Sequence, residues 1–408
     1  MGIAYSVDSD VVVRVLCTCL PGFGHFLPLT PLARAGADAG HEMAFATAAA
    51  FCPQVEKLGF AAFPAGLSFA AQLEEAARRF PEQHAMPFGQ DRFLSFVPRM
   101  LAGVAAPPRA SELVPIIREW RPDVLVHEET EFGGPAAAAA AGIPYADHSV
   151  GILRPLEMAR LARDIIAPFW EEWEIELGPF GGLFRYLYLD VCPPSLQAPE
   201  IETIDVAEPM QNAHIEAGDA SLPEWVDELR PVPTVYVSLG TLHQSRQVFI
   251  AILEGLRDED LNVIVTIGAD GDPAQLGPQP DNVHVEGFIP QAALLPHCDL
   301  VVNQGGTAIL PILAHGLPLL ILPQAANQFH NAEACVAAGV ARSLPPSEVT
   351  AEAVRAEVQA LREDAAYRER ARTIAREIEA MPGPEHGVRL LERLAHERAP
   401  VSRDAVHP

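Results

Sequence analysis

The most constraining feature of this 408-residue chain is the segment 301–332, which reads VVNQGGTAILPILAHGLPLLILPQAANQFHNA. An apolar run ends in a polar pair and two glycines, and a helix-like run, an HGLP turn and a second apolar run follow. This order predicts a strand, a glycine turn of the phosphate-binding type, a helix and a second strand. The polar side chains of the segment are almost all uncharged amides, so the ligand of this turn is the central question.

The N-terminal half repeats the pattern. Residues 11–20 (VVVRVLCTCL) predict a buried strand, residues 21–28 (PGFGHFLP) a glycine-containing loop, and a helix-like run then leads to a second strand at 41–47. Strands that alternate with helices are typical of a parallel sheet with helices on both faces. The sequence therefore predicts two doubly wound, Rossmann-like α/β domains in series. We expect the ligand at the carboxyl ends of their strands, in the crevice between the domains.

The composition shift after the first half defines the expected domain boundaries. Residues 154–230 are rich in aromatic residues, proline and glutamate and show no clean period. We therefore predict an N-terminal domain over 1–216, a linker over 217–232 and a C-terminal domain over 233–385. The remaining segment, 386–408, is expected to be a helix and tail that can cross back to the N-terminal domain.

Charge and cysteine content narrow the class of protein. The chain has 28 basic and 54 acidic residues, a net charge of −26, which repels nucleic acids and anionic membranes. Its six cysteines form no CxxC pair and no cluster with zinc spacing, so no metal site is predicted. No signal-like segment or membrane-length apolar run occurs, which favours a cytoplasmic protein with reduced thiols.

Five segments together resemble one known family: 121–144, 189–197, 235–241, 287–306 and 322–340. Their order and spacing are similar to those of the bacterial antibiotic glycosyltransferases of family 1, the macrolide and polyketide type. The resemblance extends from Val11 to about Ala395. It implies the GT-B fold, in which two Rossmann-like domains face each other across a cleft. The N-terminal domain would then bind the acceptor and the C-terminal domain the nucleotide sugar.

On the acceptor side, the resemblance assigns the catalytic base to His25. The family's base occupies a GHxxP motif, which reads GHFLP here and ends at Pro28. Histidine suits the removal of a hydroxyl proton near neutral pH. A carboxylate at the end of a later strand orients this base in the family, usually as aspartate. The equivalent here is Glu128, with Glu129 and Glu131 as the alternatives.

On the donor side, the resemblance assigns Gln304, Gly305, Gly306 and Thr307 to the nucleotide diphosphate. The family normally has histidine at the position of Gln304, and glutamine offers a hydrogen bond without a charge. The family's acidic contact to the ribose is replaced by Pro311, and the loop is one residue shorter.

Further donor contacts are expected on three other segments. Asn327 and Gln328 replace the family's Asp-Gln pair, which contacts sugar hydroxyls. Ser238, Gly240 and Thr241 match the turn that faces the phosphates. Phe288 takes the position that stacks on the nucleotide base, with Gln291 beside it; ordinary core packing is the alternative for Phe288.

The resulting functional hypothesis is an inverting transfer of a deoxysugar from a dTDP-sugar or UDP-sugar to a hydroxyl of a hydrophobic natural product. Nucleotide sugar is thus a co-substrate, and no tightly bound cofactor is expected. The alternatives are a sugar-free acid–base enzyme on the same scaffold, catalysing elimination or cyclisation, and a non-catalytic helper, against which His25 argues. The sequence leaves open whether the protein forms a homodimer.

Segments 60–105 and 150–195 are expected to line the pocket of a flat, polyketide-like or aromatic acceptor. Their aromatic residues are Phe63, Phe69, Phe88, Phe93, Phe96, Phe169, Trp170, Trp173, Phe180, Phe184 and Tyr186. Ordinary core packing is the alternative for many of them.

Overall fold

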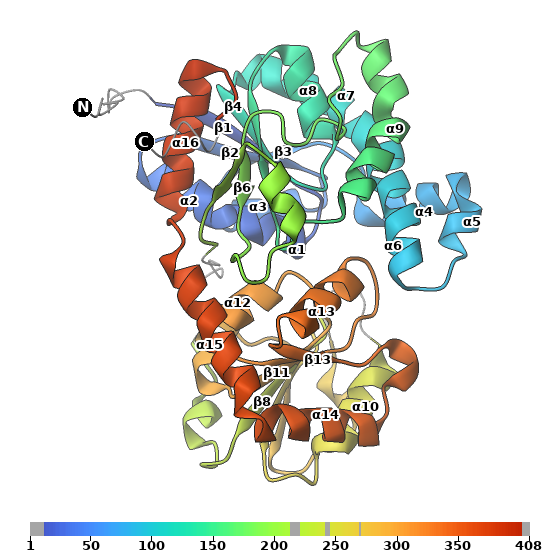
Figure 1. The fold of residues 1–408 in the computed structure, drawn as a ribbon, viewed down its shortest axis with the longest axis vertical. Coiled ribbons are helices and arrows are strands. Elements are labelled where there is room, and N and C mark those ends of the chain that lie inside the picture. The colour runs from blue at the N-terminus through green and yellow to red at the C-terminus, as the bar shows by residue number, and fades with distance from the viewer. Residues whose placement is uncertain (1–11, 213–220, 241–244, 269–270, 402–408) are drawn as a thin grey trace.

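A computed structural model describes residues 12–212, 221–240, 245–268 and 271–401 (Figure 1). Within these ranges the N-terminal half forms a sheet in the order β3-β2-β1-β4-β5-β6-β7, with every neighbouring pair parallel. The strands are β1 (Arg14–Thr18), β2 (Glu42–Thr47), β3 (Ala61–Pro64), β4 (Val124–Glu128), β5 (Tyr145–His148), β6 (Tyr188–Asp190) and β7 (Ala207–Pro209).

The C-terminal half forms a second parallel sheet in the order β10-β9-β8-β11-β12-β13. Its strands are β8 (Thr234–Ser238), β9 (Asn262–Thr266), β10 (Val283–Glu286), β11 (Leu300–Asn303), β12 (Leu319–Ile321) and β13 (Ala341–Ser343). In each sheet the strand order reverses beside the first strand, between β1 and β4 and between β8 and β11. Ligands of doubly wound sheets bind at such switch points, so the topology itself defines where a site is expected.

The helices pack on the faces of the two sheets (Figure 1). In the N-terminal domain they are α1 (Phe23–Phe26), α2 (Thr30–Asp38), α3 (Cys52–Glu56), α4 (Phe69–Arg79), α5 (Pro81–His84), α6 (Gln90–Pro98), α7 (Ala106–Trp120), α8 (Gly133–Ala141) and α9 (Leu156–Glu172). In the second half of the chain they are α10 (Arg246–Leu256), α11 (Gln291–Leu294), α12 (Ile309–Ala314), α13 (Gln328–Ala337), α14 (Ala351–Glu363), α15 (Ala365–Ala380) and α16 (Pro384–Glu397).

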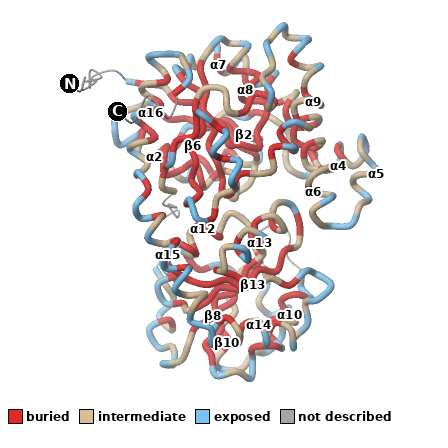
Figure 2. Tube along the Cα trace, viewed as in Figure 1, coloured by how far each residue is buried: buried red, intermediate tan, exposed pale blue. Residues whose placement is uncertain are grey.

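Burial follows from this layering, because a parallel sheet between helices has no solvated face. All five residues of β4 are buried, as are those of β9, and Figure 2 shows the buried residues concentrated in the strands. The apolar runs that predicted the strands are therefore core residues of both sheets.

Two segments differ from the sequence-based expectation. The predicted loop at 21–28 contains the short helix α1, which includes His25. The segment 154–230, expected to lack regular structure, contains the 17-residue helix α9 and the strands β6 and β7. In α9 the buried residues Ala159, Ala162, Ile166 and Trp170 recur at helical spacing, but Pro168 within the helix obscures the pattern.

The C-terminal helices connect the two halves. Helix α15 runs along the C-terminal domain, and α16 lies beside α2 of the N-terminal domain (Figure 1). Nε2 of His41 lies 2.9 Å from Oε1 of Glu392 on α16. The backbone N–H of Ser195 donates to Oε2 of Glu377 on α15 at 3.0 Å. The end of the chain thus contributes contacts that hold the two domains in one arrangement.

Candidate active site

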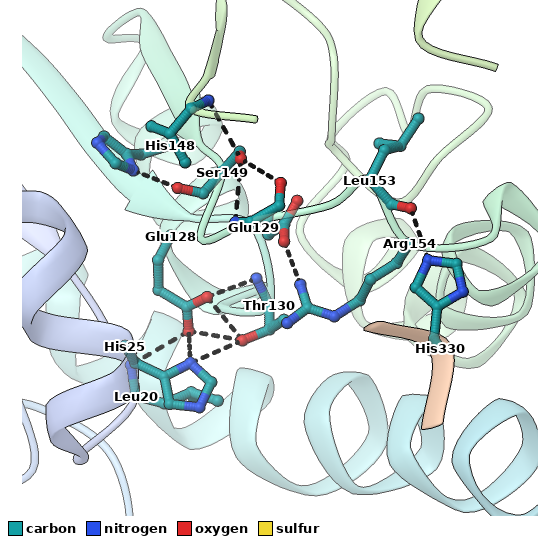
Figure 3. Close-up of polar contacts among 12 residues, drawn as sticks. Leu20, His25, Glu128, Glu129, Thr130, His148, Ser149, Leu153, Arg154 and His330 are labelled. Atoms are coloured by element: carbon teal, nitrogen blue, oxygen red, sulfur yellow. Dashed lines mark hydrogen bonds and ion pairs between the residues drawn. The ribbon is translucent and has the colours of Figure 1, made fainter. Parts of the chain in front are cut away.

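A histidine–carboxylate pair lies at the switch point of the N-terminal sheet. His25 belongs to α1, directly after β1, and Glu128 is the last residue of β4. Because β1 and β4 are adjacent and parallel, their carboxyl ends bring the two side chains together. Nδ1 of His25 lies 3.1 Å from Oε1 of Glu128, as Figure 3 shows. The His25 side chain is 27% exposed and that of Glu128 is fully buried, so only the imidazole is accessible from the cleft.

Hydrogen bonds keep the buried Glu128 ionised. Burial by itself would raise the pKa of its carboxyl group, but His25 and the donors on Thr130 outweigh burial and lower this pKa to about 2. The Thr130 N–H donates to Oε2 at 2.8 Å, and the Leu20 N–H donates to Oε1 at 3.4 Å. A carboxylate with this pKa stays charged throughout the neutral range and can stabilise a positive charge on the neighbouring imidazole.

The other two acids of the EETE segment have different partners. Glu129 contacts the guanidinium of Arg154 and accepts a hydrogen bond from the Tyr188 hydroxyl at 2.9 Å. Burial raises the pKa of Glu129, an effect that Arg154 opposes without cancelling it.

Glu131 is a structural acid. Its carboxylate accepts from the N–H groups of Gly133 (2.6 Å) and Gly134 (2.8 Å), the first residues of α8, and from the Thr18 hydroxyl (2.7 Å). It thereby satisfies backbone donors that a helix start leaves unpaired. Of the three acids considered from the sequence, the structure brings only Glu128 to His25.

A mostly apolar cavity opens beside the pair. Its empty volume, including the open mouth, is about 440 Å³. The polar members of its lining are Glu129, Thr130 and Arg154, and the others are Pro98, Leu101, Phe132, Leu153, Pro155, Leu156, Met158, Ala159, Leu183 and Phe184. The cavity thus lies next to Thr130, which contacts His25, and offers apolar walls with few polar atoms.

Most of the aromatic residues expected to line an acceptor pocket do not line this cavity. Phe184 does line it, whereas Phe93, Phe96 and Trp170 are buried in the core and Phe88 is exposed on the surface. Phe132, which the sequence did not single out, takes part in the lining. The apolar wall is built mainly by the segment 153–159, at the start of α9.

On the C-terminal side, the glycine turn after β11 meets the turn after β8. Gln304 follows β11, and its amide lies so close to Gly240 and Gly306 that a Cβ on Gly240 would overlap with Nε2. Gly240 and Gly305 both have positive φ (72° and 83°), which favours glycine. The two turns at the switch point of the C-terminal sheet therefore pack directly on each other.

The same turn contacts the helix of the histidine. A Cβ placed on Gly24 would lie 3.2 Å from the Thr307 hydroxyl oxygen. Gly24 precedes His25 in α1, so the turn after β11 lies against the helix that carries His25.

The remaining residues predicted from the donor motif have mixed surroundings. Asn327 precedes α13, where Gln328 is buried and its Oε1 accepts from the N–H groups of Gln324 (2.7 Å) and Ala325 (2.9 Å). The side-chain oxygen of Gln328 thus stabilises the turn that leads into α13. Asn331, one turn later in α13, donates to the carbonyl of Gly305 at 2.8 Å and fixes the glycine turn from behind.

Ser238 ends β8 and pairs in register with Asn303, beside the glycine turn. Phe288 and Gln291 lie after β10, towards the edge of the sheet, and Phe288 is 63% exposed. That exposure rules out core packing as the reason for an aromatic residue at this position. Thr241 lies outside the described residues.

A direct contact joins the donor-side helix to the cavity. Nε2 of His330, on α13, lies 3.1 Å from the carbonyl oxygen of Leu153, a residue of the cavity wall (Figure 3). Arg154 follows immediately and contacts Glu129. Sequence analysis singled out neither His330 nor Arg154, because no spacing along the chain indicates a contact between segments this far apart.

The part of the chain that the structure describes contains no group of three or more His, Cys, Asp or Glu side chains arranged to hold a metal ion. Among its helices, none combines the length and the apolar character needed to span a bilayer.

Two doubly wound parallel sheets whose switch points face each other across a cleft define the GT-B class of glycosyltransferases. Residues 34–240 and 250–394 match, respectively, the N-terminal and C-terminal domains of the family described as erythromycin biosynthesis protein CIII-like. The chain belongs to this family of bacterial antibiotic glycosyltransferases.

Individual relatives agree with this assignment. L-demethylnoviosyl transferase of Streptomyces niveus is 32% identical over 386 residues, which cover 91% of this chain and 96% of the relative. 10-Deoxymethynolide desosaminyltransferase of Streptomyces venezuelae is 26% identical over 446 residues, covering 97% and 100%. The chain is therefore similar to sugar transferases along nearly their whole length.

Solved structures of glycosyltransferases also match nearly the whole chain. The glycosyltransferase SnogD from Streptomyces nogalater has a TM-score of 0.75 and 27% identity, covering 94% of this chain and 100% of that one. The glycosyltransferase SsfS6 of Streptomyces sp. SF2575, complexed with thymidine diphosphate, has a TM-score of 0.78 and 26% identity, covering 93% and 99%. These similarities confirm the GT-B fold that the sequence predicted.

Proposed function

We propose that the enzyme transfers a sugar, with inversion at the anomeric carbon, from a dTDP-sugar or UDP-sugar to a hydroxyl group of a hydrophobic natural product. The observation that carries this proposal is the position of His25. It pairs with the buried Glu128 on one side and adjoins the glycine turn of the C-terminal domain, through Gly24 and Thr307, on the other. A base placed between an acceptor cavity and a phosphate-type turn suits direct displacement.

In this mechanism Nε2 of His25 removes the proton of the acceptor hydroxyl while the oxygen attacks the anomeric carbon. The bond from that carbon to the diphosphate oxygen breaks, and the diphosphate departs with the electron pair. Glu128 holds the Nδ1–H and stabilises the imidazolium that forms. A single displacement of this kind inverts the configuration.

The donor is assigned to the C-terminal switch point. Gln304, Gly306 and Thr307 are the proposed contacts to the diphosphate, together with Ser238, Gly240 and Thr241. The helix that follows, α12, has six residues and begins only at Ile309, so we assign much of the contact to side-chain amides and hydroxyls. Phe288, exposed after β10, is the proposed stacking surface for the base.

We infer the donor nucleotide from a similar glycosyltransferase structure and the acceptor class from the lining of the cavity. The structure of SsfS6 was determined with thymidine diphosphate, which supports dTDP as the nucleotide here. The acceptor is proposed to be a polyketide-like or aromatic aglycone, because the cavity beside Thr130 is walled mainly by apolar side chains.

The test is a transfer assay with dTDP-sugars and UDP-sugars against a panel of hydroxylated polycyclic aromatic acceptors, with products detected by mass spectrometry. The wild type should give a glycoside whose anomeric configuration, read by NMR coupling constants, is opposite to that of the donor. His25→Ala should lower kcat by roughly 10²-fold, whereas His396→Ala, at an exposed position on α16, should not. Retained configuration, or full activity of His25→Ala, would overturn the proposal.

A further inference from the structure

The carboxylate of Glu128 has an unusual set of partners, and one residue supplies most of them. Thr130 donates its backbone N–H to Oε2 at 2.8 Å, and its hydroxyl oxygen lies 2.6 Å from Oε1 and 2.7 Å from Oε2. The same hydroxyl oxygen lies 3.3 Å from Nδ1 of His25 (Figure 3). Thr130 therefore contacts both members of the pair, and it is buried, as Glu128 is.

Glutamate needs such a clamp more than aspartate would. The glutamate side chain has one more methylene and one more rotatable bond. Its carboxylate can therefore adopt more positions, and the side chain loses more rotamer entropy when it is fixed. The two donors of Thr130 fix both carboxylate oxygens. Oε1 is then held towards Nδ1 of His25 at 3.1 Å.

The Thr130 hydroxyl also affects which ring nitrogen of His25 carries the proton. A threonine hydroxyl has one proton to donate and lone pairs to accept with. When that proton goes to the carboxylate, a lone pair of the hydroxyl oxygen is left for Nδ1–H. Nδ1 is then flanked by two acceptors, Oε1 of Glu128 and the Thr130 oxygen, which favours the tautomer with the proton on Nδ1.

We infer that Thr130 is a positioning residue of the transfer reaction: its hydroxyl clamps the long side chain of Glu128 and selects the His25 tautomer whose Nε2 is free to accept a proton. This inference rests on the proposed role of His25 as the base. It adds a third member to the pair, one that acts through the other two without contact to the reacting atoms.

The experiment reads the tautomer directly in the unliganded protein. Two-bond ¹H–¹⁵N correlation spectra of protein labelled with ¹⁵N-histidine distinguish a protonated from an unprotonated ring nitrogen, and His25→Ala assigns the signal. Spectra are recorded at a pH where the imidazole is neutral. Thr130→Val removes the hydroxyl and keeps the branched shape, and Thr130→Ser keeps the hydroxyl.

The wild type and Thr130→Ser should show His25 protonated mainly on Nδ1. In Thr130→Val the ratio of the Nδ1–H to the Nε2–H tautomer should fall about two- to tenfold, the range expected for loss of one net hydrogen bond. Thr130→Ala should give the same shift and replaces the valine variant if that variant does not fold.

A matched control is available at Thr18, an equally buried residue whose hydroxyl donates to Glu131 instead. Thr18→Val should leave the His25 tautomer unchanged. The inference is overturned if Thr130→Val and Thr130→Ala keep the wild-type ratio, or if Thr130→Ser shifts it as much as valine does. Because no sugar donor is used, either outcome is independent of whether the proposed transfer is observed.

Discussion

Replacing Glu128 by glutamine should destabilise the protein by an amount that depends on pH in a defined way. The carboxyl pKa falls from an ordinary value of about 4.5 to about 2 in the folded protein, against the effect of burial, through His25 and Thr130. That displacement corresponds to about 3 kcal/mol, because each pKa unit is worth 1.36 kcal/mol. Glutamine approximates the neutral carboxyl group, and its NH₂ would face groups that are already donors.

The sign follows from linkage. A carboxyl group with a lowered folded-state pKa adds stability above its unfolded-state pKa, and the contribution disappears as the pH falls towards about 2. We therefore expect Glu128→Gln to lose about 3 kcal/mol of unfolding free energy at pH 7. At pH 3.5 the loss should be only about 2 kcal/mol, since the wild type has by then lost part of its own advantage.

Urea unfolding followed by near-ultraviolet circular dichroism at both pH values measures these differences. Glu129→Gln is the matched control, since Glu129 is the adjacent buried acid but its pKa is raised. A raised pKa means that the fold favours the neutral form, so this substitution should not reproduce the loss at pH 7. Equal stability of Glu128→Gln and the wild type at pH 7, or a loss that grows as the pH falls, would refute the reasoning.

Three further substitutions test other parts of the site. Gln304→His should lower the Kd for dTDP about two- to fivefold in calorimetry, because a charge-assisted contact replaces a neutral one; an unchanged Kd would place this side chain away from the phosphates. Phe288→Ala should weaken dTDP binding about tenfold or more with an unchanged melting temperature, whereas a lower melting temperature alone would indicate packing. Glu131→Gln should cost about 1–2 kcal/mol of unfolding free energy through the start of α8, with no effect on the Kd for dTDP.

Strands such as β1, β2, β11 and β12 could be predicted from the sequence because each is a short apolar run between turn residues, whereas the three-residue strands β6 and β7 were not. Both glycine turns were also found, since tight turns at strand ends require residues that tolerate positive φ, as Gly240 and Gly305 do. Helix α1 was missed because its four residues include a glycine, which has low helix propensity. Helix α9 was missed because Pro168 interrupts its pattern.

The sequence could predict the residues of the site only where a motif identifies them. His25 and Glu128 were identified by their motif positions, but the sequence could not separate Glu128 from Glu129 and Glu131. Their roles differ through partners that fold in from elsewhere: Arg154 for Glu129 and Thr18 for Glu131. Such long-range contacts leave no periodic signal in a single sequence.

The most direct test of the central claim, that the glycine turn after β11 holds a nucleotide diphosphate for sugar transfer, is a calorimetric titration of the wild-type protein with dTDP and with UDP. We predict saturable binding of one nucleotide per chain with a Kd below millimolar, tighter for dTDP than for UDP. Absence of binding for both nucleotides at millimolar concentration would contradict it. If His25 were nevertheless required for conversion of a metabolite, the scaffold would instead carry out sugar-free acid–base chemistry.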